Sequence, residues 1–591
     1  MTNEFEILER ELPQARAAID AELAEHSAVL RRVYAARGVT RADDLQLATT
    51  GLHTPAQLTG VGAAAARIAA AVQNAEFVLF VGDFDADGAT ASALGVSLLE
   101  ALGAARVDFL VPNRFNFGYG LTPELVALAL RDKPDLIITV DNGISSINGV
   151  QCANDADIDV VVTDHHLPGP ELPAALAVVN PNQHDCEFPS KNLAGVGVIW
   201  YVLSATRRVL ADAGWFAQRA EPNPAQWLDL VALGTIADVV PLDRNNRILV
   251  QQGLARMRTG NLRPGLRALA KVAGKNLPEM VSQDLAFALG PRLNAAGRLE
   301  DMTIGIRCLL ATDDEEALRL ATALNELNQA RRSIEQEMSQ EAELAILDLP
   351  VVSDTRKGLT VYREHWHQGV VGIVAGRMRE RFFRPVIAFA EAGSTAPDEL
   401  KGSARSIPGL HVRDVLAAID AQFPGLIVRF GGHAMAAGLS LKRRHYERFA
   451  KAFDAAVGEQ VGEDDLRNTV LTDGVLEGSD LTLANAEVLA RAGPWGQGFE
   501  EPLFHGEFEL VSQRVVGENH LKMVVGIDGQ LFDAIKFRQA PLSFSDAESN
   551  VSSLSDSNAD KQRVQLVYHL AVNEWRERRS LQLLVEHCRP L

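Results

Sequence analysis

Short apolar runs alternate with helical patterns over residues 75–300. The runs FVLFV, LIITV and VVVT each end in polar residues, and helical patterns such as ATASALGVSLLEALG lie between them. Such runs are typical of strands buried on both faces. Their alternation with helices predicts a parallel sheet joined by right-handed crossovers. We therefore expect an α/β domain in this part of the chain.

The pattern differs elsewhere along the chain. The first 70 residues are rich in Ala and Leu at helical spacing, and the stretch from Asp313 to Leu347 has good helix formers without Gly or Pro. Strands and helices mix again after this stretch, and short β-rich runs such as HLKMVVGI then predict a small barrel or sandwich. We expect an α/β multidomain protein with five parts: a helical segment (1–70), the parallel-sheet domain (71–312), a connecting helix (313–347), a second α/β domain (348–460) and a C-terminal β-barrel domain (461–591).

Composition indicates a globular protein of several domains. The chain has 591 residues, of which 47% are hydrophobic and 23% charged. Its N-terminus is acidic without an apolar segment, and no apolar stretch reaches the roughly 20 residues that span a bilayer. The four cysteines are scattered without a CxxC pair. These features predict no signal peptide, no membrane partner, reduced thiols and a cytoplasmic location.

The net charge of −20 argues against non-specific coating of a nucleic acid. A local basic channel remains compatible with this balance. The Ser-, Asp- and Asn-rich stretch 541–562 is predicted to be a surface loop that can be deleted without unfolding the protein.

Acidic and histidine residues gather where apolar runs end. They are Asp83, Asp85 and Asp87 after FVLFV, Asp141 after LIITV, Asp164, His165 and His166 after VVVT, and Asp238 in GTIADVVPL. Ligand sites of parallel sheets collect at the carboxyl ends of strands, and we expect all four groups at such ends. Carboxylates and imidazoles gathered there repel one another unless a cation lies among them. The pattern therefore predicts a metal site, and more than one ion.

The ligand types narrow the choice of metal. The spacing of Asp83, Asp85 and Asp87 also occurs in calcium loops, but Ala93-Leu94-Gly95 lies where the closing Glu should be. Mixed Asp and His ligands favour Mn²⁺, with Mg²⁺ as the alternative. Two such ions about 3.5–4 Å apart catalyse phosphoryl transfer. For any one of these acids a helix N-cap or a turn is the commoner role, and the four groups together outweigh it.

Several motifs resemble those of one protein family. GDFDADGAT, DNG, TDHH and GTIADVVPL resemble the DHH phosphoesterase superfamily. GPRLNAAGR, WHQGVVGIVAGR, GSARS and GGHAMAAG resemble its RecJ branch of single-strand-specific exonucleases. The resemblance implies a DHH catalytic domain, a DHHA1 substrate-binding domain and an OB-like nucleic-acid-binding barrel. It also implies two-metal hydrolysis of single-stranded DNA from 5′ to 3′ into mononucleotides, in DNA repair and recombination.

The resemblance also implies roles for the clustered residues. Asp85 and Asp87 would bind metal, Asp141 would bridge both ions, and His165 and Asp238 would complete the second ion's ligands. His166 would act in catalysis by facing the scissile phosphate, with Asp164 orienting the histidines. Val81 stands where many family members have a histidine, so Asp83 is a further candidate metal ligand.

Arginines and polar residues within the matched motifs are the predicted contacts to DNA. They are Arg114, Arg292, Asn294, Arg298, Arg377, Ser403, Arg405 and His433. Arginine forks suit phosphate oxygens, although a solvated or ion-paired role is commoner for any single Arg. The resemblance implies that Ser403, Arg405 and Arg298 contribute to a pocket for a 5′ phosphate, which would set the polarity.

Aromatic residues add candidates for base stacking. Phe115, Phe117 and Tyr119 follow Arg114, with core packing at least as plausible for the two Phe. In the C-terminal barrel the candidates for a DNA face are Trp495, Lys522, Trp575, Arg576, Arg578 and Arg579. For the two Trp, core packing and stacking on DNA are weighed equally.

Two other functions remain open. One is a phosphoesterase of the same superfamily acting on small substrates, although such chains are usually shorter and lack the barrel. The other is a non-catalytic DNA-binding scaffold, although degenerate relatives of that kind lose metal-site acids. The expected partner is single-stranded DNA with a 5′ end, with a single-strand-binding protein and a RecQ-type helicase as further candidates. We expect a monomer because no heptad seam is present.

Overall fold

The computed structural model describes most of the chain, in the ranges 5–112, 119–347, 356–393, 396–517, 520–537, 541–542, 562–575 and 578–591. Four predicted positions, Arg114, Phe115, Phe117 and Arg576, lie outside the described residues, as does most of the predicted loop 541–562. Within the described residues, no helix has the length and hydrophobicity needed to cross a membrane. All four cysteines are free.

The chain divides into two compact units. The larger unit comprises Leu8–Asn294, Met302–Thr322 and Leu471–Leu591, and the smaller unit comprises Met1–Ile7, Ala295–Asp301 and Ala323–Val470. The long predicted helix is present as α14 (Asp314–Leu347), which begins in the larger unit and ends in the smaller one.

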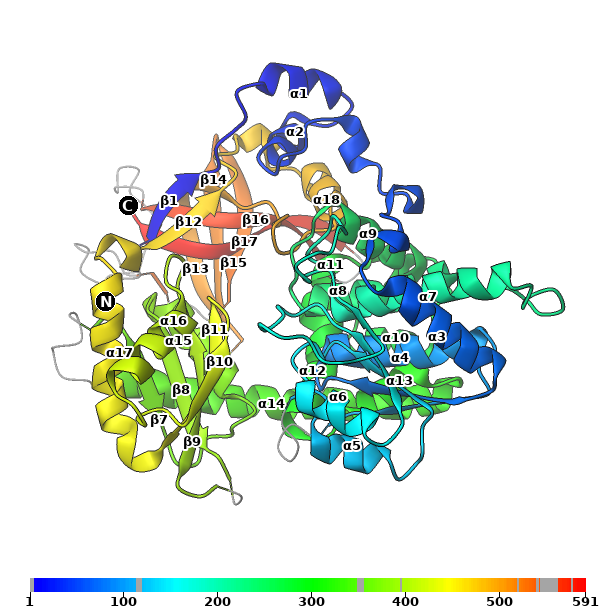
Figure 1. Cartoon of the computed structure of the whole chain (residues 1–591). Coiled ribbons are helices and arrows are strands. Elements are labelled where there is room, and N and C mark those ends of the chain that lie inside the picture. The colour runs from blue at the N-terminus through cyan, green and yellow to red at the C-terminus, as the bar shows by residue number, and fades with distance from the viewer. Residues whose placement is uncertain are drawn as a thin grey trace. The chain divides into compact units, whose positions relative to one another are not determined.

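A five-stranded parallel sheet forms the centre of the larger unit, as predicted. Its order is β3-β2-β4-β5-β6, with the strands β2 (Phe77–Gly82), β3 (Arg106–Leu110), β4 (Leu136–Val140), β5 (Asp159–Thr163) and β6 (Ala177–Val179). The odd-numbered side chains of β2 pack with residues of α5 (Pro123–Ala129) and α6 (Ile147–Asn154). On the other face, Phe80 lies against Gly95 of α4 (Ala86–Ala101), so the strand is buried on both sides. Figure 1 shows α4, α5 and α6 in this part of the larger unit.

Helices complete this part of the larger unit. They are α3 (Val61–Gln73), α7 (Gly195–Asp212), α8 (Leu228–Ala237), α9 (Arg244–Arg258), α10 (Pro264–Val272), α11 (Ser282–Asp284), a π-helix (Leu285–Leu289), α12 (Gly290–Leu299) and α13 (Thr303–Leu310). The prediction that Asp238 follows a strand is wrong, because it is the C-cap of α8. The run LDLVALGTIA is buried on all sides, and an apolar run without periodicity does not distinguish a buried helix from a buried strand.

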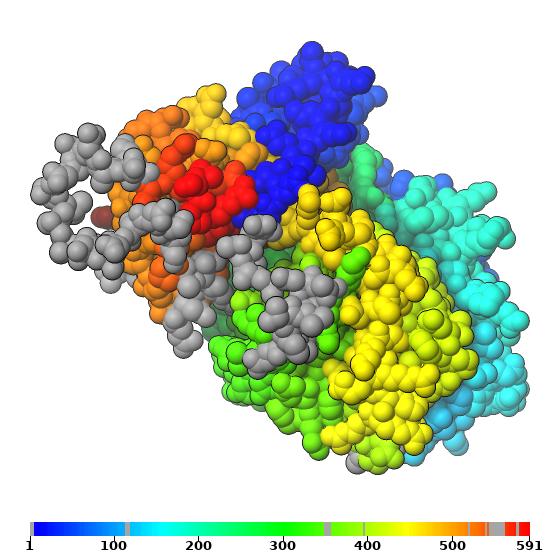
Figure 2. All heavy atoms as spheres, turned by 90° about the vertical axis from the view of Figure 1, so that its left-hand side faces the viewer, coloured from blue at the N-terminus to red at the C-terminus, as the bar shows by residue number. Residues whose placement is uncertain are grey.

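The smaller unit contains a mixed sheet flanked by helices. The order is β10-β11-β9-β8-β7, with β7 (Leu359–Tyr362), β8 (Val386–Glu391), β9 (Glu399–Arg405), β10 (Arg429–Gly432) and β11 (Ala436–Lys442). The helices are α15 (Val371–Phe382), α16 (Val412–Gln422) and α17 (Tyr446–Gln460). Residues of α16 and α17 share one core with the sheet, and α15 and α14 contribute to a second core. Figure 2 shows the yellow residues of α17 on the outer surface of this unit.

The C-terminal β-rich region forms a closed barrel. Its order is β13-β14-β15-β17-β16, with β13 (Phe504–Val516), β14 (His520–Ile527), β15 (Gln530–Lys536), β16 (Arg563–Trp575) and β17 (Arg578–Pro590). The prediction of a small barrel is therefore confirmed. Closure pairs the edge strands, which removes exposed sheet edges.

The N-terminal helices pack against the start of the C-terminal region within the larger unit. The helices are α1 (Arg16–Glu22) and α2 (Ala28–Ala35), and they follow a strand β1 (Phe5–Glu9), paired with β12 (Asn468–Thr472), that the sequence pattern did not predict. Just after α2, Arg37 forms a buried bidentate ion pair with Asp473, at 2.7 and 3.0 Å. Figure 2 shows these blue helices beside the gold and red C-terminal segments.

Candidate metal centre

The sheet places three acidic residues side by side in the larger unit. In the register of the sheet, Gly82 of β2 pairs with Val140 of β4, and Val140 pairs with Thr163 of β5. Asp83, Asp141 and Asp164 are the residues that follow these strand ends, and all three are buried. The carboxyl edge of the sheet therefore gathers carboxylates in the manner expected from the sequence.

Asp85 has the helix-capping role that the sequence left open as an alternative. Its Oδ1 accepts hydrogen bonds from the backbone N–H groups of Asp87 at 2.9 Å and Gly88 at 3.0 Å, at the start of α4. The next backbone N–H, that of Ala86, donates to Oδ1 of Asn294 at 2.9 Å. Asn294, a predicted DNA contact, therefore fixes the first turn of α4.

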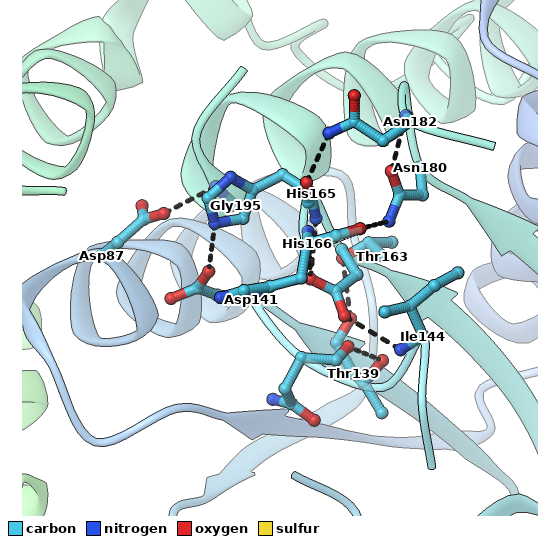
Figure 3. A network of polar contacts seen from close by, with 12 residues as sticks. Asp87, Thr139, Asp141, Ile144, Thr163, His165, His166, Asn180, Asn182 and Gly195 are labelled. Carbon is cyan, nitrogen blue, oxygen red and sulfur yellow. Dashed lines mark hydrogen bonds and ion pairs between the residues drawn. The ribbon is translucent and has the colours of Figure 1, made fainter. Parts of the chain in front are cut away.

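Asp87 is held by the first turn of α7. Its Oδ2 accepts from the N–H of Gly195 at 2.6 Å (Figure 3), and its Oδ1 accepts from the N–H of Val196 at 3.0 Å. Burial and the Asp85 charge nevertheless raise the pKa of Asp87 to about 7. A Cβ on Gly195 would lie 2.5 Å from Cβ of Asp141, so only glycine fits here. Sequence reasoning missed Gly195, and the one available signal was the AGVG stretch before an apolar helix.

Asp141 lies in the middle of the cluster with a strained backbone. Its φ is +62°, and its side chain is buried with Oδ1 3.1 Å from Nε2 of His165 (Figure 3). Burial, together with the charges of Asp87 and Asp85, raises the pKa of Asp141 well above its usual range. A carboxylate in this place is unfavourable unless a cation compensates it.

Asp164 orients both histidines that follow it. Its Oδ1 accepts from the backbone N–H of His165 at 2.7 Å and lies 2.8 Å from Nδ1 of His166, and its Oδ2 accepts from the N–H of Ile144 at 2.9 Å. Burial alone would raise the pKa of Asp164, but its hydrogen bond to His166 and the charge of His166 lower it. The same pairing outweighs the burial of His166 and raises its pKa. The ring is thus fixed and its cationic form is favoured.

His165 and Asp238 complete the cluster. Oδ2 of Asp238 is 3.5 Å from Nε2 of His165. Burial, and then the charge of His166, lower the pKa of His165 to about 4, so its imidazole is neutral and can accept a metal ion. Burial and the charges of Asp87 and Asp85 raise the pKa of Asp238 well above its usual range.

The donor atoms fit divalent cations. The ligand atoms form three groups, and within each group they lie within 4.8 Å of one another. The groups are Asp83, Asp85 and Asp141; Asp87, His165 and Asp238; and Asp141, His165 and His166. Asp141 Oδ1, His165 Nε2 and Asp238 Oδ2 are buried without a hydrogen bond among the residues that the structure describes. Oxygen donors with one or two imidazoles suit Mn²⁺ or Mg²⁺. The groups overlap at Asp141 and His165, as adjacent ions with shared ligands require.

Tyr119 lies at the exposed side of the cluster. Its hydroxyl is 3.2 Å from the backbone oxygen of Asp141 and 3.2 Å from Nδ1 of His166, and its ring meets the His166 ring edge-on. The residue is 48% exposed, so the ring is accessible to a ligand.

In the smaller unit, three predicted phosphate contacts meet at the start of α15. Nη1 of Arg405 donates to Oγ of Ser403 at 3.1 Å, and a Cβ on Gly372 would lie 3.0 Å from both side chains. Arg298 donates to the backbone oxygen of Gly369 at 3.3 Å. A helix N-terminus with a guanidinium and a hydroxyl is suited to an anion.

The remaining candidates of the smaller unit lie around these residues. The turn that carries the exposed His433 leads to Ala436, which pairs with Arg405 in the sheet. Arg377, on α15, donates from Nε to Glu335 Oε1 at 3.0 Å. Glu335 is buried and also accepts from Arg331 at 2.7 Å, so Arg377 belongs to a structural ion-pair network.

Other predicted DNA contacts of the larger unit have structural partners. Trp495 is 2% exposed, stacks on Phe499 and donates to the backbone oxygen of Leu489, so it packs in a core and cannot stack on bases here. Arg292 is nearly buried and donates to the backbone oxygen of Ala288. Lys522 pairs with Asp533 across the barrel strands, and Arg579 pairs with Glu487. Arg578 is exposed at the start of β17, and the Trp575 side chain lies outside the described residues.

Sequence comparisons match three parts of the chain to known families and the chain as a whole to known proteins. Family models match at residues 77–235 (DHH family, N-terminal domain), 355–459 (DHHA1 domain) and 472–587 (RecJ OB domain). The single-stranded-DNA-specific exonuclease RecJ of Dickeya dadantii is 52% identical, over 95% of this chain and 96% of that protein. The chain belongs to the RecJ family. The Escherichia coli exonuclease of the same name is 48% identical over the full length of both chains.

Solved structures of the RecJ family agree with this fold. RecJ of Thermus thermophilus in complex with Mn²⁺ superposes with a TM-score of 0.76 at 29% identity, covering 99% of this chain and 79% of that one. The same protein in complex with Mg²⁺ gives a TM-score of 0.71 at 27% identity, with coverages of 99% and 78%. The likeness to the family's fold therefore covers nearly all of this chain.

Proposed function

We propose that this protein is a metal-dependent exonuclease that hydrolyses single-stranded DNA from the 5′ end to mononucleotides. The observation that carries the proposal is the overlap of three groups of carboxylate and imidazole ligands, which share Asp141 and His165, at the carboxyl edge of the sheet. Membership of the RecJ family supports it, because relatives with 52% and 48% identity are named single-stranded-DNA-specific exonucleases.

We propose Mn²⁺ as the cofactor, with two ions and with Mg²⁺ as the alternative. Asp85, Asp87, Asp141, His165 and Asp238 would hold the ions, with Asp83 beside them. When bound, such ions activate water and stabilise the charge of a phosphodiester undergoing attack. The complexes of the Thermus protein with each metal support this choice.

The chain's own residues would orient the substrate and offset its charge. Asp164 fixes the His166 ring through the 2.8 Å contact to Nδ1, and the raised pKa of His166 favours the cationic imidazolium. That cation would bind a phosphate oxygen and offset the charge that develops on it. The hydroxyl of Tyr119, 3.2 Å from the His166 ring nitrogen, would keep the ring in place from the other side.

We propose that the residues at the start of α15 bind the terminal 5′ phosphate. Arg405 and Ser403 approach each other at Gly372, and Arg298 binds the backbone at Gly369. Arg405 has no carboxylate partner among the described residues. Its pKa is lowered by burial and, to a lesser degree, by the nearby charge of Arg379. A phosphate dianion would compensate the positive charges of Arg405 and Arg379. Binding of the terminal 5′ phosphate at this place would set the 5′→3′ polarity.

Digestion of end-labelled oligonucleotides tests the function directly. We expect metal-dependent release of 5′ mononucleotides from a single strand, and little release from a blunt duplex of the same sequence. A 3′ label should persist until the last nucleotides are removed. Release from the 3′ end, or equal hydrolysis of the duplex, would overturn the proposal.

Further aspects of the function are proposed on the family membership alone. We propose action in DNA repair and recombination in the cytoplasm, as a monomer. A single-strand-binding protein and a RecQ-type helicase would supply the single strand. Sedimentation of the purified chain, and stimulation of digestion of a duplex by such a helicase, would test the oligomeric state and the partnership.

A further inference from the structure

Three apolar side chains are exposed on segments that carry, or pack against, residues of the candidate metal centre. Leu167 follows His166 and is 61% exposed, Val239 follows Asp238 and is 62% exposed, and Phe287 is 74% exposed. All three belong to the larger unit. Large side chains this exposed lose the benefit of burial in the core.

The helix that carries Phe287 packs against α8, which ends at Asp238 of the cluster. This helix is the π-helix Leu285–Leu289, which continues into α12. A Cβ on Gly290 would lie 3.2 Å from Cβ of Ala237, the residue before Asp238. Asn294, further along α12, binds the first turn of α4 beside Asp85. π-helical turns are frequent at functional sites, and this one presents a phenyl ring to solvent.

Neither the backbone conformation nor core packing accounts for a valine at position 239. Its φ is +61°, and it is the one β-branched residue with a positive φ among the described parts of the chain. A β-branched residue is a genuine outlier there, and glycine would adopt the same φ without strain. Because the side chain is 62% exposed, core packing does not compensate the strain. Strain of this kind clusters at ligand sites.

We propose that Leu167, Val239 and Phe287 form an apolar rim that contacts nucleobases as a single strand enters the metal centre. This inference rests on the proposed exonuclease function and adds a basis for choosing single strands. Bases of a single strand can turn their faces to an apolar side chain or an aromatic ring. In a duplex these faces are stacked inside, so the rim would meet phosphates, sugars and the edges of bases but no base face. The rim would therefore favour unpaired strands by contact as well as by shape.

Variants of the rim test the contact with bases. We compare Leu167→Ala, Val239→Gly and Phe287→Ala on two single-stranded oligonucleotides, one ordinary and one with abasic residues at its first few 5′ positions. Phe287→Ala should lower kcat/KM on the ordinary strand about tenfold, which is the usual loss for one stacked base. The same variant should leave hydrolysis of the abasic strand unchanged, because that strand offers no base to contact.

Matched controls separate this inference from other causes of lost activity. Leu176→Ala removes a side chain that is 44% exposed at the amino end of β6, on the opposite edge of the sheet, and should change neither rate. Val239→Gly should lower the rate on the ordinary strand while leaving the melting temperature equal or higher, since it removes backbone strain. Equal losses on both strands, or no loss in any of the three variants, would overturn the rim. Absence of hydrolysis by the wild-type protein on either strand would overturn the proposed function itself.

Discussion

The carboxylate–histidine cluster of the larger unit and the Arg405 group of the smaller unit are opposite in charge. The cluster gathers buried carboxylates, and the pKa values of Asp141 and Asp238 are raised well above their usual range by burial and by neighbouring acids. At the start of α15, burial and then the charge of Arg379 lower the pKa of Arg405. Each region holds like charges that a ligand of the opposite charge would compensate.

The two regions differ in how many of their polar atoms form hydrogen bonds within the protein. Arg405 donates to Ser403 Oγ and to the backbone oxygen of Ala404. In the cluster, Asp141 Oδ1, His165 Nε2 and Asp238 Oδ2 make no hydrogen bond within the described residues. Repulsion inside the cluster therefore destabilises the metal-free fold more than the arginine group does. Cations should control stability, whereas the 5′ phosphate should control selectivity.

The largest expected effect comes from the centre of the cluster. Asp141→Asn removes the carboxylate that links the overlapping groups of ligands, so nuclease activity should fall on the order of a thousandfold or more. The metal-free melting temperature should stay equal or rise, because one buried like charge is lost. Initial rates with Mn²⁺ and thermal unfolding in a chelator measure both quantities. Wild-type rates in the variant would show that Asp141 is no ligand.

The buried network around Glu335 is a third region in which opposite charges are already paired. Glu335→Ala would leave Arg331 buried without its carboxylate, so the free energy of unfolding should fall by about 3 kcal/mol. Urea unfolding measures this loss. The control is Glu343→Ala, because Glu343 lies on the same helix α14 as Glu335 and is a more exposed carboxylate, paired with Arg381 of α15. A loss no larger than that of the control would contradict a structural role for the network.

The arginine group should affect the choice of DNA end more than the rate of chemistry. Arg405→Ala should lower the preference for a 5′-phosphorylated over a 5′-hydroxyl end about tenfold, because one charge-assisted hydrogen bond to the phosphate is lost. Competition between the two substrates measures the preference. Arg381→Ala, an exposed change on the neighbouring helix α15, should leave the preference unchanged. An equal loss of rate on both ends would argue against a phosphate pocket.

The smallest effect is a pH dependence of the metal-free protein. The pKa of Asp87 is about 7 in the folded state, against an ordinary value of 3.8, so folding takes up a proton between these values. The resulting stability is present below about pH 4 and is lost as pH rises towards 7. In a chelator, the contribution of Asp87 should lower the melting temperature by roughly 5 °C from pH 5 to pH 8, and Mn²⁺ should abolish the decline. A decline of the melting temperature that persists in Mn²⁺ would contradict the prediction, because it would show that the titrating group does not bind the metal.

The sequence predicted those parts of the cluster that depend on strand ends. β2, β4 and β5 are continuous apolar runs, and a parallel sheet brings the residues after such runs to one edge. It misplaced Asp238, because an apolar run buried on all sides has no period that separates helix from strand. Strand β1 was missed, because a single short strand among helical patterns is defined by its partner β12 and not by its own residues.

Contacts set by tertiary packing were beyond the reach of the sequence. The N–H groups of Gly195 and Val196 bind Asp87 from a segment more than a hundred residues away, and nothing in Asp87's neighbourhood indicates them. Likewise, the left-handed backbone of Val239 contradicts its local propensity. The burial of Trp495 depends on Phe499 and on the N-terminal helices, which a count of aromatic residues does not reveal.

The ion pair between Arg37 and Asp473 has a consequence for dissecting the protein into fragments. Both side chains are buried, Arg37 also donates to the backbone oxygen of Glu500, and Tyr34 donates to that of Ala492. Helix α2 and the residues just after it thus belong to the same compact unit as the segment that leads into the barrel. A fragment that starts at the DHH match or contains the barrel alone would expose apolar surface and leave one charge unpaired. We therefore expect the DHH and OB parts of the chain to be less stable as separate fragments than within the whole protein.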